Sequence, residues 1–424
     1  MRYTFPTRWK TYRLDELGLV SRGRSRHRPR NDPSLYGGSY PFFQTGDVKS
    51  ANLYLSEYSQ TYNGVGLAQS KKWQPGTLCI TIAANIAETA ILKIHGCFPD
   101  SIIGFVADSK KADVLFIKYY IDFLKLDMQQ ISHGTTQDNL SADKLFRFHF
   151  IVPDIIEQKK ITSILSAYDD LIENNLRRIK ILEVMAQNLY REWFVKFRFP
   201  GHEYACFVDS PLGQIPEGWQ VKTVGNTFTI LGGGTPSKEV PEYWSEGMVN
   251  WYSPSNLTSE TTMFMDESDI KINALGLKMS SARMFPPYSV MMTSRATIGV
   301  VSINTTAACT NQGFITCIPN ENFPLYMLYF WIKQNVEYFI SLGTGSTFKE
   351  IIKGVFKNIE LIVPSEAIVS EYSAYVVPMA NQVLNLQRRN TRLRGFRDIL
   401  LPKLISGKID VSELDITVPE EVHT

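Results

Sequence analysis

The residues with the clearest chemical potential form a basic stretch near the amino terminus. The segment SRGRSRHRPRN carries five arginines at alternate positions: Arg22, Arg24, Arg26, Arg28 and Arg30. Guanidinium groups neutralise phosphates and can pair in bidentate fashion with guanine edges. The stretch therefore predicts a loop that contacts nucleic acid, with an ordinary solvated run of charge as the alternative.

Other polar side chains on predicted loops are weaker candidates for the same kind of contact. Each is able to hydrogen-bond to a phosphate or a base edge, but taken alone each also fits an ordinary surface role. The set comprises Gln44, Lys71, Lys72 and Asn85 in the first half of the chain, and Ser237, Lys238, Ser255, Asn256, Arg295 and Lys349 in the second. The sequence TFKE at 347–350 also has the pattern of a capping box, which predicts the start of a helix.

The sequence contains no motif that supports catalysis. FPPY at 285–288 is similar to the motif with which adenine methyltransferases hold a flipped base, but Phe285 stands where an Asn or Asp side chain is needed. We therefore expect a turn there. The glycines at 232–234 lack the Gly-Lys-Ser/Thr of a phosphate-binding loop, and the six histidines are scattered. We expect no catalytic centre, no metal site and no cofactor in this chain.

The composition is that of an ordinary globular protein. A length of 424 residues predicts two or three domains, and the formal charge of +2 excludes a strong overall field for nucleic acid. Five dispersed cysteines without a C-x-x-C pair argue against disulfides and zinc. No run of 18 apolar residues and no signal peptide are found, so we expect a soluble cytoplasmic protein without membrane contact.

The elements that would position these residues occur twice. The two halves match at a shift of about 210 residues: Trp9 corresponds to Trp219, and residues 134–153 align without gaps on residues 345–364. Between these matching points, both halves show a short strand, at 78–82 and 289–293, and an apolar helix, at 115–128 and 325–340. Each half therefore predicts one mixed α/β globule.

A long amphipathic helix is expected after each globule. Apolar residues recur at intervals of three and four, the spacing of a coiled-coil seam, with one asparagine in each stripe. The seam residues are Ile161, Leu165, Tyr168, Ile172, Asn175, Ile179, Leu182 and Leu189 in the first helix, and Val383, Leu386, Asn390 and Leu393 in the second. We expect the two helices to pair antiparallel, the alternative being that each packs on its own globule. Pro378 should kink the second helix or mark its start.

Two closing segments complete the pattern: LYREWFVKFRFPG at 189–201 and FRDILLPKLISGKI at 396–409. With globule and long helix repeated before them, the chain resembles the specificity subunits of type I restriction-modification enzymes. The expected fold class is α+β, with two mixed α/β target-recognition domains in tandem. The expected boundaries are 1–153 and 216–364 for the two domains, 154–197 and 365–408 for the two spacer helices, 198–215 for a linker and 409–424 for a tail.

The resemblance implies a DNA-recognition subunit without catalysis of its own. Each domain would read one half of a bipartite target in double-stranded DNA. Two DNA-methyltransferase subunits and translocase-nuclease subunits would be the partners, and they would hold S-adenosylmethionine, ATP and Mg. Three alternatives stay open: the recognition subunit of a type II system with a fused methyltransferase-nuclease partner, a standalone DNA methyltransferase, and a coiled-coil adaptor with two protein-binding globules.

Overall fold

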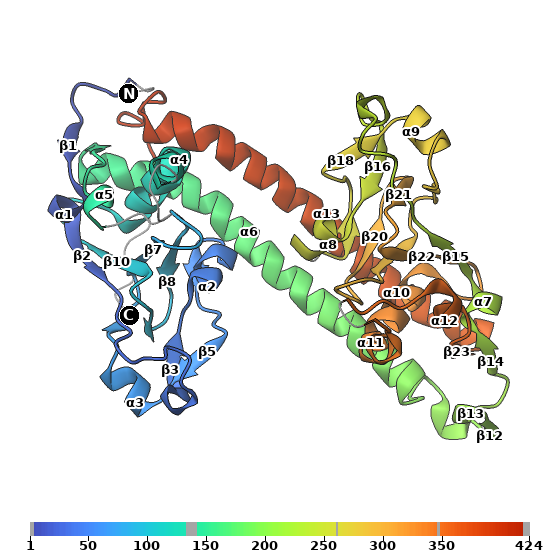
Figure 1. The fold of residues 1–424 in the computed structure, drawn as a ribbon. Helices are drawn as coiled ribbons and strands as arrows, with labels where there is room; N and C mark the ends of the chain where they lie inside the picture. Colours follow the sequence, from blue (N-terminus) through green and yellow to red (C-terminus); the bar gives the residue numbers. More distant parts are fainter. Residues whose placement is uncertain (1–3, 133–141, 260–261, 346–347, 419–424) are drawn as a thin grey trace. The chain divides into compact units, whose positions relative to one another are not determined.

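The computed structural model describes residues 4–132, 142–259, 262–345 and 348–418. The chain folds into two compact units, one formed by residues 1–174 with 390–424 and the other by residues 175–389 (Figure 1). Each unit contains one mixed α/β domain and a part of both long helices. The two tandem domains and the α+β class expected from the sequence are confirmed.

The domain of the first unit is built on a five-stranded sheet. Two of its three inner strands, β7 and β8, consist of buried apolar and threonine side chains, as a strand covered on both faces requires. In spatial order the strands are β2 (Gly18–Arg22), β10 (Ile102–Ala107), β7 (Leu78–Thr81), β8 (Thr89–Leu92) and β4 (Tyr54–Leu55). Helix α4 (Val114–Ser132) packs against β8.

Smaller elements complete this domain. A four-stranded sheet has the order β5 (Gln60–Tyr62), β3 (Tyr36–Phe42), β9 (Gly96–Cys97) and β6 (Lys72–Trp73), and a ribbon pairs β1 (Lys10–Tyr12) with β11 (Phe150–Val152). The short helices are α1 (Leu14–Leu17), η1 (Pro33–Leu35), α2 (Thr45–Ser50), α3 (Gly64–Ala68) and α5 (Ala142–Leu145).

The domain of the second unit repeats the strand order of the five-stranded sheet. Its five-stranded sheet runs β15 (Thr229–Gly232), β22 (Phe314–Ile318), β19 (Val290–Thr293), β20 (Val301–Asn304) and β17 (Phe264–Met265). A three-stranded sheet runs β18 (Ile270–Ile272), β16 (Val249–Tyr252) and β21 (Ala308–Thr310). The ribbon pairs β14 (Gln220–Thr223) with β23 (Glu360–Val363). The hairpin of β12 (Phe207–Ser210) and β13 (Gly213–Pro216) precedes this domain.

The helices of the second domain also follow the plan of the first. They are α7 (Val224–Thr227), η4 (Pro241–Tyr243), α8 (Pro254–Ser259), α9 (Ala274–Lys278), α10 (Leu325–Gln334), α11 (Val336–Leu342) and α12 (Lys353–Lys357). Matching asparagines begin α3 and α9: the side chain of Asn63 accepts from Gly66 N at 3.1 Å, and that of Asn273 from Gly276 N at 2.9 Å. The internal repeat therefore extends to individual capping bonds.

The two long helices are α6 (Ile155–Tyr190), which ends in the π-helical turn η2 (Arg191–Val195), and α13 (Glu366–Ile405). In the first unit Asn390 Nδ2 donates to Ile172 O at 3.4 Å, and in the second unit the rings of Tyr190 and Tyr372 lie 6.3 Å apart. The helices therefore run antiparallel. Because α13 already begins at Glu366, Pro378 lies inside it, and the expectation that this proline marks its start is wrong.

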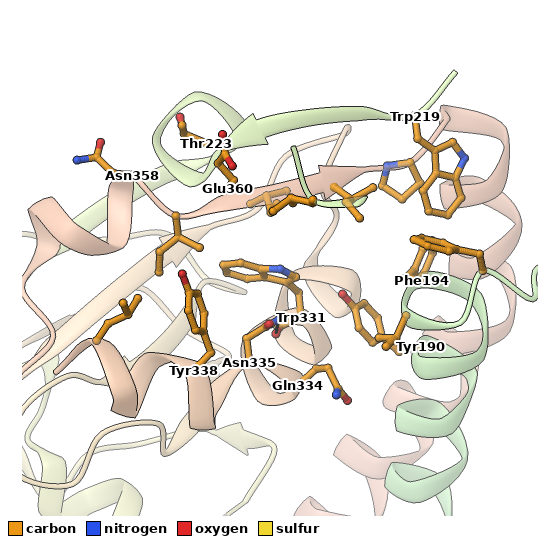
Figure 2. Close-up of a pocket in the computed structure, with 18 of the residues that line it drawn as sticks. Tyr190, Phe194, Trp219, Thr223, Trp331, Gln334, Asn335, Tyr338, Asn358 and Glu360 are labelled. Atoms are coloured by element: carbon orange, nitrogen blue, oxygen red, sulfur yellow. Dashed lines mark hydrogen bonds between the residues drawn. The ribbon is translucent and has the colours of Figure 1, made fainter. Parts of the chain in front are cut away.

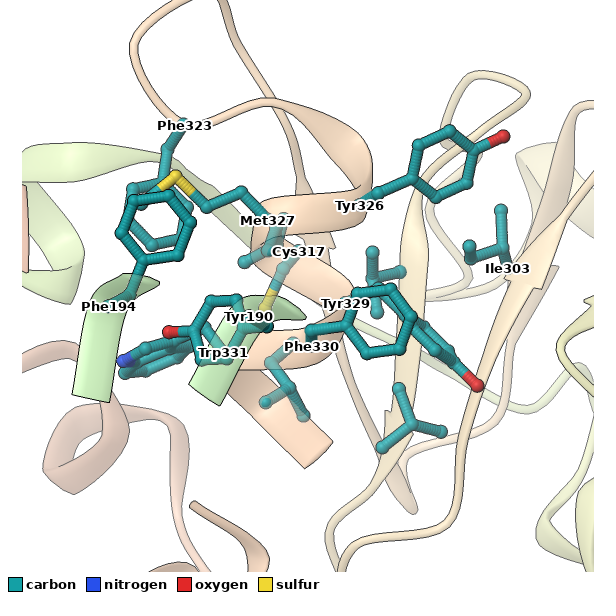
Figure 3. Close-up of a cluster of buried hydrophobic side chains, with 14 of the residues drawn as sticks. Tyr190, Phe194, Ile303, Cys317, Phe323, Tyr326, Met327, Tyr329, Phe330 and Trp331 are labelled. Carbon is teal, nitrogen blue, oxygen red and sulfur yellow. The ribbon is translucent and has the colours of Figure 1, made fainter. Parts of the chain in front are cut away.

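The side chains of the proposed seam are mostly buried. Tyr168, Leu182, Leu189 and Leu393 are partly exposed, and the remaining eight, including Asn175 and Asn390, are buried. Around the end of α6, Tyr190 and Phe194 pack into the aromatic core of the second unit, near Phe330 and Trp331 of α10 (Figure 3). The apolar stripe therefore faces both the other long helix and the adjacent domain.

Two further observations concern the termini and the cysteines. Arg8 binds both Glu157 at the start of α6 and Asp410 of the tail, at 2.9 and 2.8 Å, so the tail is attached to the first domain. The cysteines form no disulfide, and Cys206 is the exposed one. Within the part of the chain that the structure describes, no helix is long and apolar enough to cross a membrane.

A buried ion pair connects α6, α13 and α4 in the first unit. The carboxylate of Asp169 is fully buried; it accepts from Arg397 Nη1 and from the Tyr119 hydroxyl, each at 2.5 Å. Burial, followed by the charge of Asp169, raises the pKa of Tyr119, which keeps this phenol protonated as the donor. The buried carboxylate of Asp169 therefore has its charge and its hydrogen-bonding capacity satisfied by Arg397 and Tyr119.

We predict that Asp169→Asn lowers the free energy of unfolding of the first unit by about 3–5 kcal/mol, because it removes the buried counter-charge of a largely buried guanidinium and leaves only an exposed one. Chemical denaturation of the whole chain, with hydrogen exchange of residues 390–405, measures the loss. Asp398→Asn is the control: Asp398 also binds Arg397 but is 63% exposed, and its loss should cost less than about 1 kcal/mol. Equal losses for the two variants would contradict the prediction.

Candidate nucleic-acid interface

One edge of the first five-stranded sheet brings together the basic stretch and the loop that carries Asn85. Strand β10 starts at Ile102, which pairs with Thr81 at the end of β7, and its next residue, Ile103, pairs with Arg22 at the end of β2. The basic stretch after β2 and the hairpin loop after β7 therefore leave the sheet at the same edge.

Main-chain hydrogen bonds fix the start of the basic stretch. Gly23 N donates to Ile102 O at 2.8 Å and Arg24 N to Phe98 O at 3.0 Å. A Cβ atom on Gly23 would lie 2.3 Å from Pro99 O, so glycine alone fits this close approach. Further along, Gln69 Oε1 accepts from the backbone nitrogens of residues 26 and 27. The backbone of the stretch is therefore held in place at several points.

The arginines of the stretch divide into two groups. Arg28 Nη1 donates to Ser25 O at 2.7 Å and to His27 O at 2.8 Å, and Arg30 forms an ion pair with Asp100 at 2.8 Å. These two arginines brace the loop itself. The side chains of Arg22, Arg24 and Arg26 are exposed, and no partner is recorded for them among the described residues. These three guanidinium groups are available to an anionic ligand.

Lys71 extends this positive surface. Its ammonium lies 3.6 Å from the centroid of the Trp73 ring, and the Trp73 ring stacks on Phe98 with centroids 4.8 Å apart. Burial, followed by the charge of Arg24, lowers the pKa of Lys71. Lys71 and Arg24 are therefore near enough to repel each other, and an anion between them would relieve that repulsion. Lys72 lies next in the chain, on β6, and is exposed.

The side chain of Gln44 is held by a short hydrogen bond, whereas that of Asn85 has only a longer contact. Gln44 precedes α2, and its Nε2 donates to Gln60 Oε1 at 2.7 Å. Asn85 lies on the loop between β7 and β8, and Lys49 Nζ of α2 approaches its Oδ1 at 3.5 Å. Sequence reasoning did not select Lys49, since the spacing of residues 49 and 85 gives no sign of their contact.

In the second unit a glycine loop occupies the place of the basic stretch. Gly234 N donates to Thr310 O at 2.8 Å, as Arg24 N does to Phe98 O, and a Cβ atom on Gly233 would lie 2.0 Å from Asn311 O. Ser237 is held in place by the Trp244 indole, which donates to its carbonyl at 3.0 Å. Lys238, the next residue, is exposed.

Ser255 and Asn256 lie at the start of α8, and one of them is buried. Asn256 is 6% exposed; its Oδ1 accepts from Ser253 N at 2.7 Å and its Nδ2 donates to Asp269 at 2.7 Å. This amide therefore holds the loop in place. A side chain that contacts DNA must face solvent, and that of Asn256 does not. Ser255 Oγ lies 2.8 Å from Ser253 Oγ.

Arg295 and Lys349 are adjacent in the second unit. Ala296 N donates to Lys349 O at 3.0 Å, and Arg295 Nε lies 3.8 Å from a carboxylate oxygen of Glu350. The helix start predicted at 347–350 is wrong for the described residues 348–350: Glu350 forms β-bridges, and α12 begins only at Lys353. Thr347 lies outside the described residues.

Sequence reasoning also missed a group of cations in the second unit. Burial, followed by the charges of Lys357 and Arg283, lowers the pKa of Lys353. A signal for Arg283 was present in the repeat, because a shift of 212 residues places it on Lys71. Lys353 and Lys357 of α12 match none of the candidate residues in the first half of the chain, so the repeat gave no signal for them.

The remaining features of this unit do not join the candidate interface. The segment FPPY forms the expected turn: Phe285 is 2% exposed and Tyr288 has a φ of 61°.

A pocket of about 890 Å³ lies between the end of α6, the β14–β23 ribbon and helices α10 to α12, with Tyr190, Trp331 and Tyr338 on its walls (Figure 2). None of the selected polar residues lines it. Among the described residues no cluster of three metal-binding side chains occurs.

Comparisons with known proteins agree on one family. The model of the type I restriction modification DNA specificity domain matches residues 6–183 and 216–370. The MjaIX specificity subunit of Methanocaldococcus jannaschii is 25% identical over 421 residues, covering 96% of this chain and 95% of its own. The HindI specificity subunit of Haemophilus influenzae is 23% identical over 471 residues, covering 95% of this chain and 99% of its own.

A solved structure supports the fold. The S subunit of a type I restriction-modification system from M. genitalium superposes with a TM-score of 0.56 at 16% identity, covering 93% of this chain and 96% of the other. With two family domains in tandem and the same architecture over nearly the whole chain, this protein belongs to the specificity subunits of type I restriction-modification systems.

Proposed function

We propose that this chain reads a bipartite DNA target, one half-site with each domain, and presents that target to catalytic partner subunits. The observation that carries the proposal is a repeated frame with different side chains. The loops that begin at Gly23 and Gly233 share a close backbone approach at the glycine and one main-chain bond from the next residue, Arg24 or Gly234. The first loop is nevertheless rich in arginine, whereas the second carries Thr235, Ser237 and Lys238. Equal frames with unequal polar chemistry suit two different half-sites.

The proposed partners are two DNA-methyltransferase subunits and, in restriction, translocase-nuclease subunits. They would supply S-adenosylmethionine, ATP and Mg, and this chain would act without a catalytic centre of its own. The recognition domains would be residues 1–153 and 216–364. Helices α6 and α13, with 36 and 40 residues, are about 54 and 60 Å long at 1.5 Å per residue and would serve as the spacer.

Domain exchange tests the modular part of the proposal. If residues 1–153 are replaced by the corresponding domain of another family member, the half-site read by that domain should change while the other stays the same. The reason is that each domain has its own sheet and its own loop edge. Sequencing of DNA methylated by the complex with its methyltransferase subunits gives the motif. A change in both half-sites would show that the domains do not read independently.

The salt dependence of binding tests the basic stretch. Changing Arg22, Arg24 and Arg26 together to Ala should reduce the slope of log K against log salt by up to about 2.7, since each phosphate contact contributes about 0.9. Arg30→Ala is the matched control, because Arg30 is paired with Asp100, and it should leave the slope nearly unchanged. An unchanged slope in the triple variant would show that this stretch does not contact DNA. If the native complex itself did not bind DNA, the alternative of a coiled-coil adaptor with two protein-binding globules would be favoured.

The spacer role has its own test. Buried Asn175 and Asn390, 3% and 1% exposed, are placed to favour one register of the two helices. Inserting about four residues, one helical turn, beside Asn175 should lengthen the unread gap while both half-site sequences persist. The methylated motif is again the readout. A gap of unchanged length, or altered half-site bases, would show that the helices do not set the spacing.

A further inference from the structure

The hairpin loops that join β7 to β8 and β19 to β20 share their main-chain hydrogen bonds. We call residues 82–88, between β7 and β8, hairpin loop 1, and residues 294–300, between β19 and β20, hairpin loop 2. In loop 1 Ala87 N donates to Thr81 O at 2.9 Å, and in loop 2 Gly299 N donates to Thr293 O at 2.9 Å. The hydroxyls of Thr81 and Thr293 then accept from the last backbone nitrogen of each loop, at 2.9 and 3.0 Å.

Both loops contain the same uncommon turn. Ala84 and Ala296 have φ angles of 62° and 63°, in the left-handed region that non-glycine residues seldom adopt. In each loop a hydrogen bond of 2.8 Å closes the turn around that alanine, from Asn85 N to Ala83 O and from Thr297 N to Arg295 O. A tight two-residue turn would join antiparallel strands with less strain. The retained strain in both domains points to a function for the loop tip.

The two loops share the alanine of the turn and one isoleucine: Ala84 matches Ala296, and Ile86 matches Ile298, with both isoleucines buried at 7% and 8% exposure. The other five positions differ, and they include the two that flank the alanine at the tip. On either side of the alanine, loop 1 has Ala83 and Asn85, whereas loop 2 has Arg295 and Thr297. Arg295 and Thr297 are exposed, and Asn85 is partly exposed.

Cations lie beside both tips. Lys49 approaches Asn85 Oδ1 at 3.5 Å, and the basic stretch that begins at Arg22 leaves the sheet at the same edge as loop 1. Loop 2 leaves the corresponding edge of its own sheet, where Gly232 pairs with Ile315 and Thr293 with Phe314. Exposed Lys349 is bonded through its backbone carbonyl to Ala296. Each tip therefore has at least one cationic residue beside it, which suits an element that must lie against the DNA backbone while it reads bases.

We propose that hairpin loops 1 and 2 are equivalent base-reading loops, with Asn85 contacting a base of the first half-site and Arg295 a base of the second. This inference rests on the proposed reading of DNA by the two domains. Asn pairs with the N6 and N7 edge of adenine, and Arg with the O6 and N7 edge of guanine. Loop 1 therefore selects adenine at its position, and loop 2 selects guanine.

The shared frame allows a transplant of two residues. Ala83→Arg with Asn85→Thr gives loop 1 the tip side chains of loop 2 without altering the alanine turn or the buried isoleucine. The variant, assembled with its methyltransferase subunits, is incubated with a DNA library of randomised half-sites, and methylated molecules are sequenced. We expect the preferred base to change at one position of the first half-site, towards guanine, and the second half-site to stay as in the native protein.

Two truncations and a control complete the experiment. Asn85→Ala and Arg295→Ala should each weaken base preference roughly 5- to 150-fold at one position, in the first and second half-site respectively. Gln74→Arg adds the transplanted charge to an exposed turn at the opposite end of β7 and should change neither half-site. Size-exclusion chromatography shows whether each variant assembles with its methyltransferase subunits. If the two-residue transplant does not assemble, the two truncations alone test whether the loops read bases.

The outcomes separate the two claims. If Asn85→Ala and Arg295→Ala assemble and retain the native preference at every position, hairpin loops 1 and 2 do not read bases, and the proposal is overturned while the bipartite function stands. A change in the half-site of the other domain overturns it as well. If the native complex itself shows no split motif, the proposed function fails before any variant is compared.

Discussion

Main-chain pairing at the start of one strand determines where the polar side chains of each domain lie. Strand β10 holds the end of β2 on one side and the end of β7 on the other, and β22 does the same for β15 and β19. The loops that follow are therefore forced to one edge of the sheet. The close approach of Gly23 to Pro99 O, and of Gly233 to Asn311 O, permits no side chain at either position. This constraint fixes the frame and leaves the outward side chains free to differ.

The same constraint explains why some predictions from sequence succeeded. A repeat of about 210 residues, apolar strands and helices with regular spacing all depend on local pattern, and the structure reproduces them. The roles of Arg28 and Asn256 depend instead on side-chain hydrogen bonds that only the folded loops provide. Arg28 turns back onto the carbonyls of its own loop, and Asn256 bonds to Asp269 across the chain. Nothing in residue type or spacing distinguishes such side chains from those that face solvent.

Tertiary packing also overrides local propensity in α13. Proline removes one helical hydrogen bond and disfavours a helix around it. Pro378 is exposed, whereas Val376 and Ala380 on either side of it are buried at 1% and 2% exposure. Burial of this face stabilises the helix past the proline, so the helix starts at Glu366. The capping-box pattern at 347–350 failed for a related reason, since backbone bridges to Arg295 and Thr344 hold Glu350 in an extended segment.

The central claim is that one chain reads two separated DNA sequences with two copies of one frame. The most direct measurement is the motif methylated by the native complex with its methyltransferase subunits, mapped by sequencing modified bases over a whole genome. The account predicts a motif of two short, different half-sites separated by a gap of fixed length in which every base is tolerated. A continuous motif, or methylation without sequence preference, would contradict it.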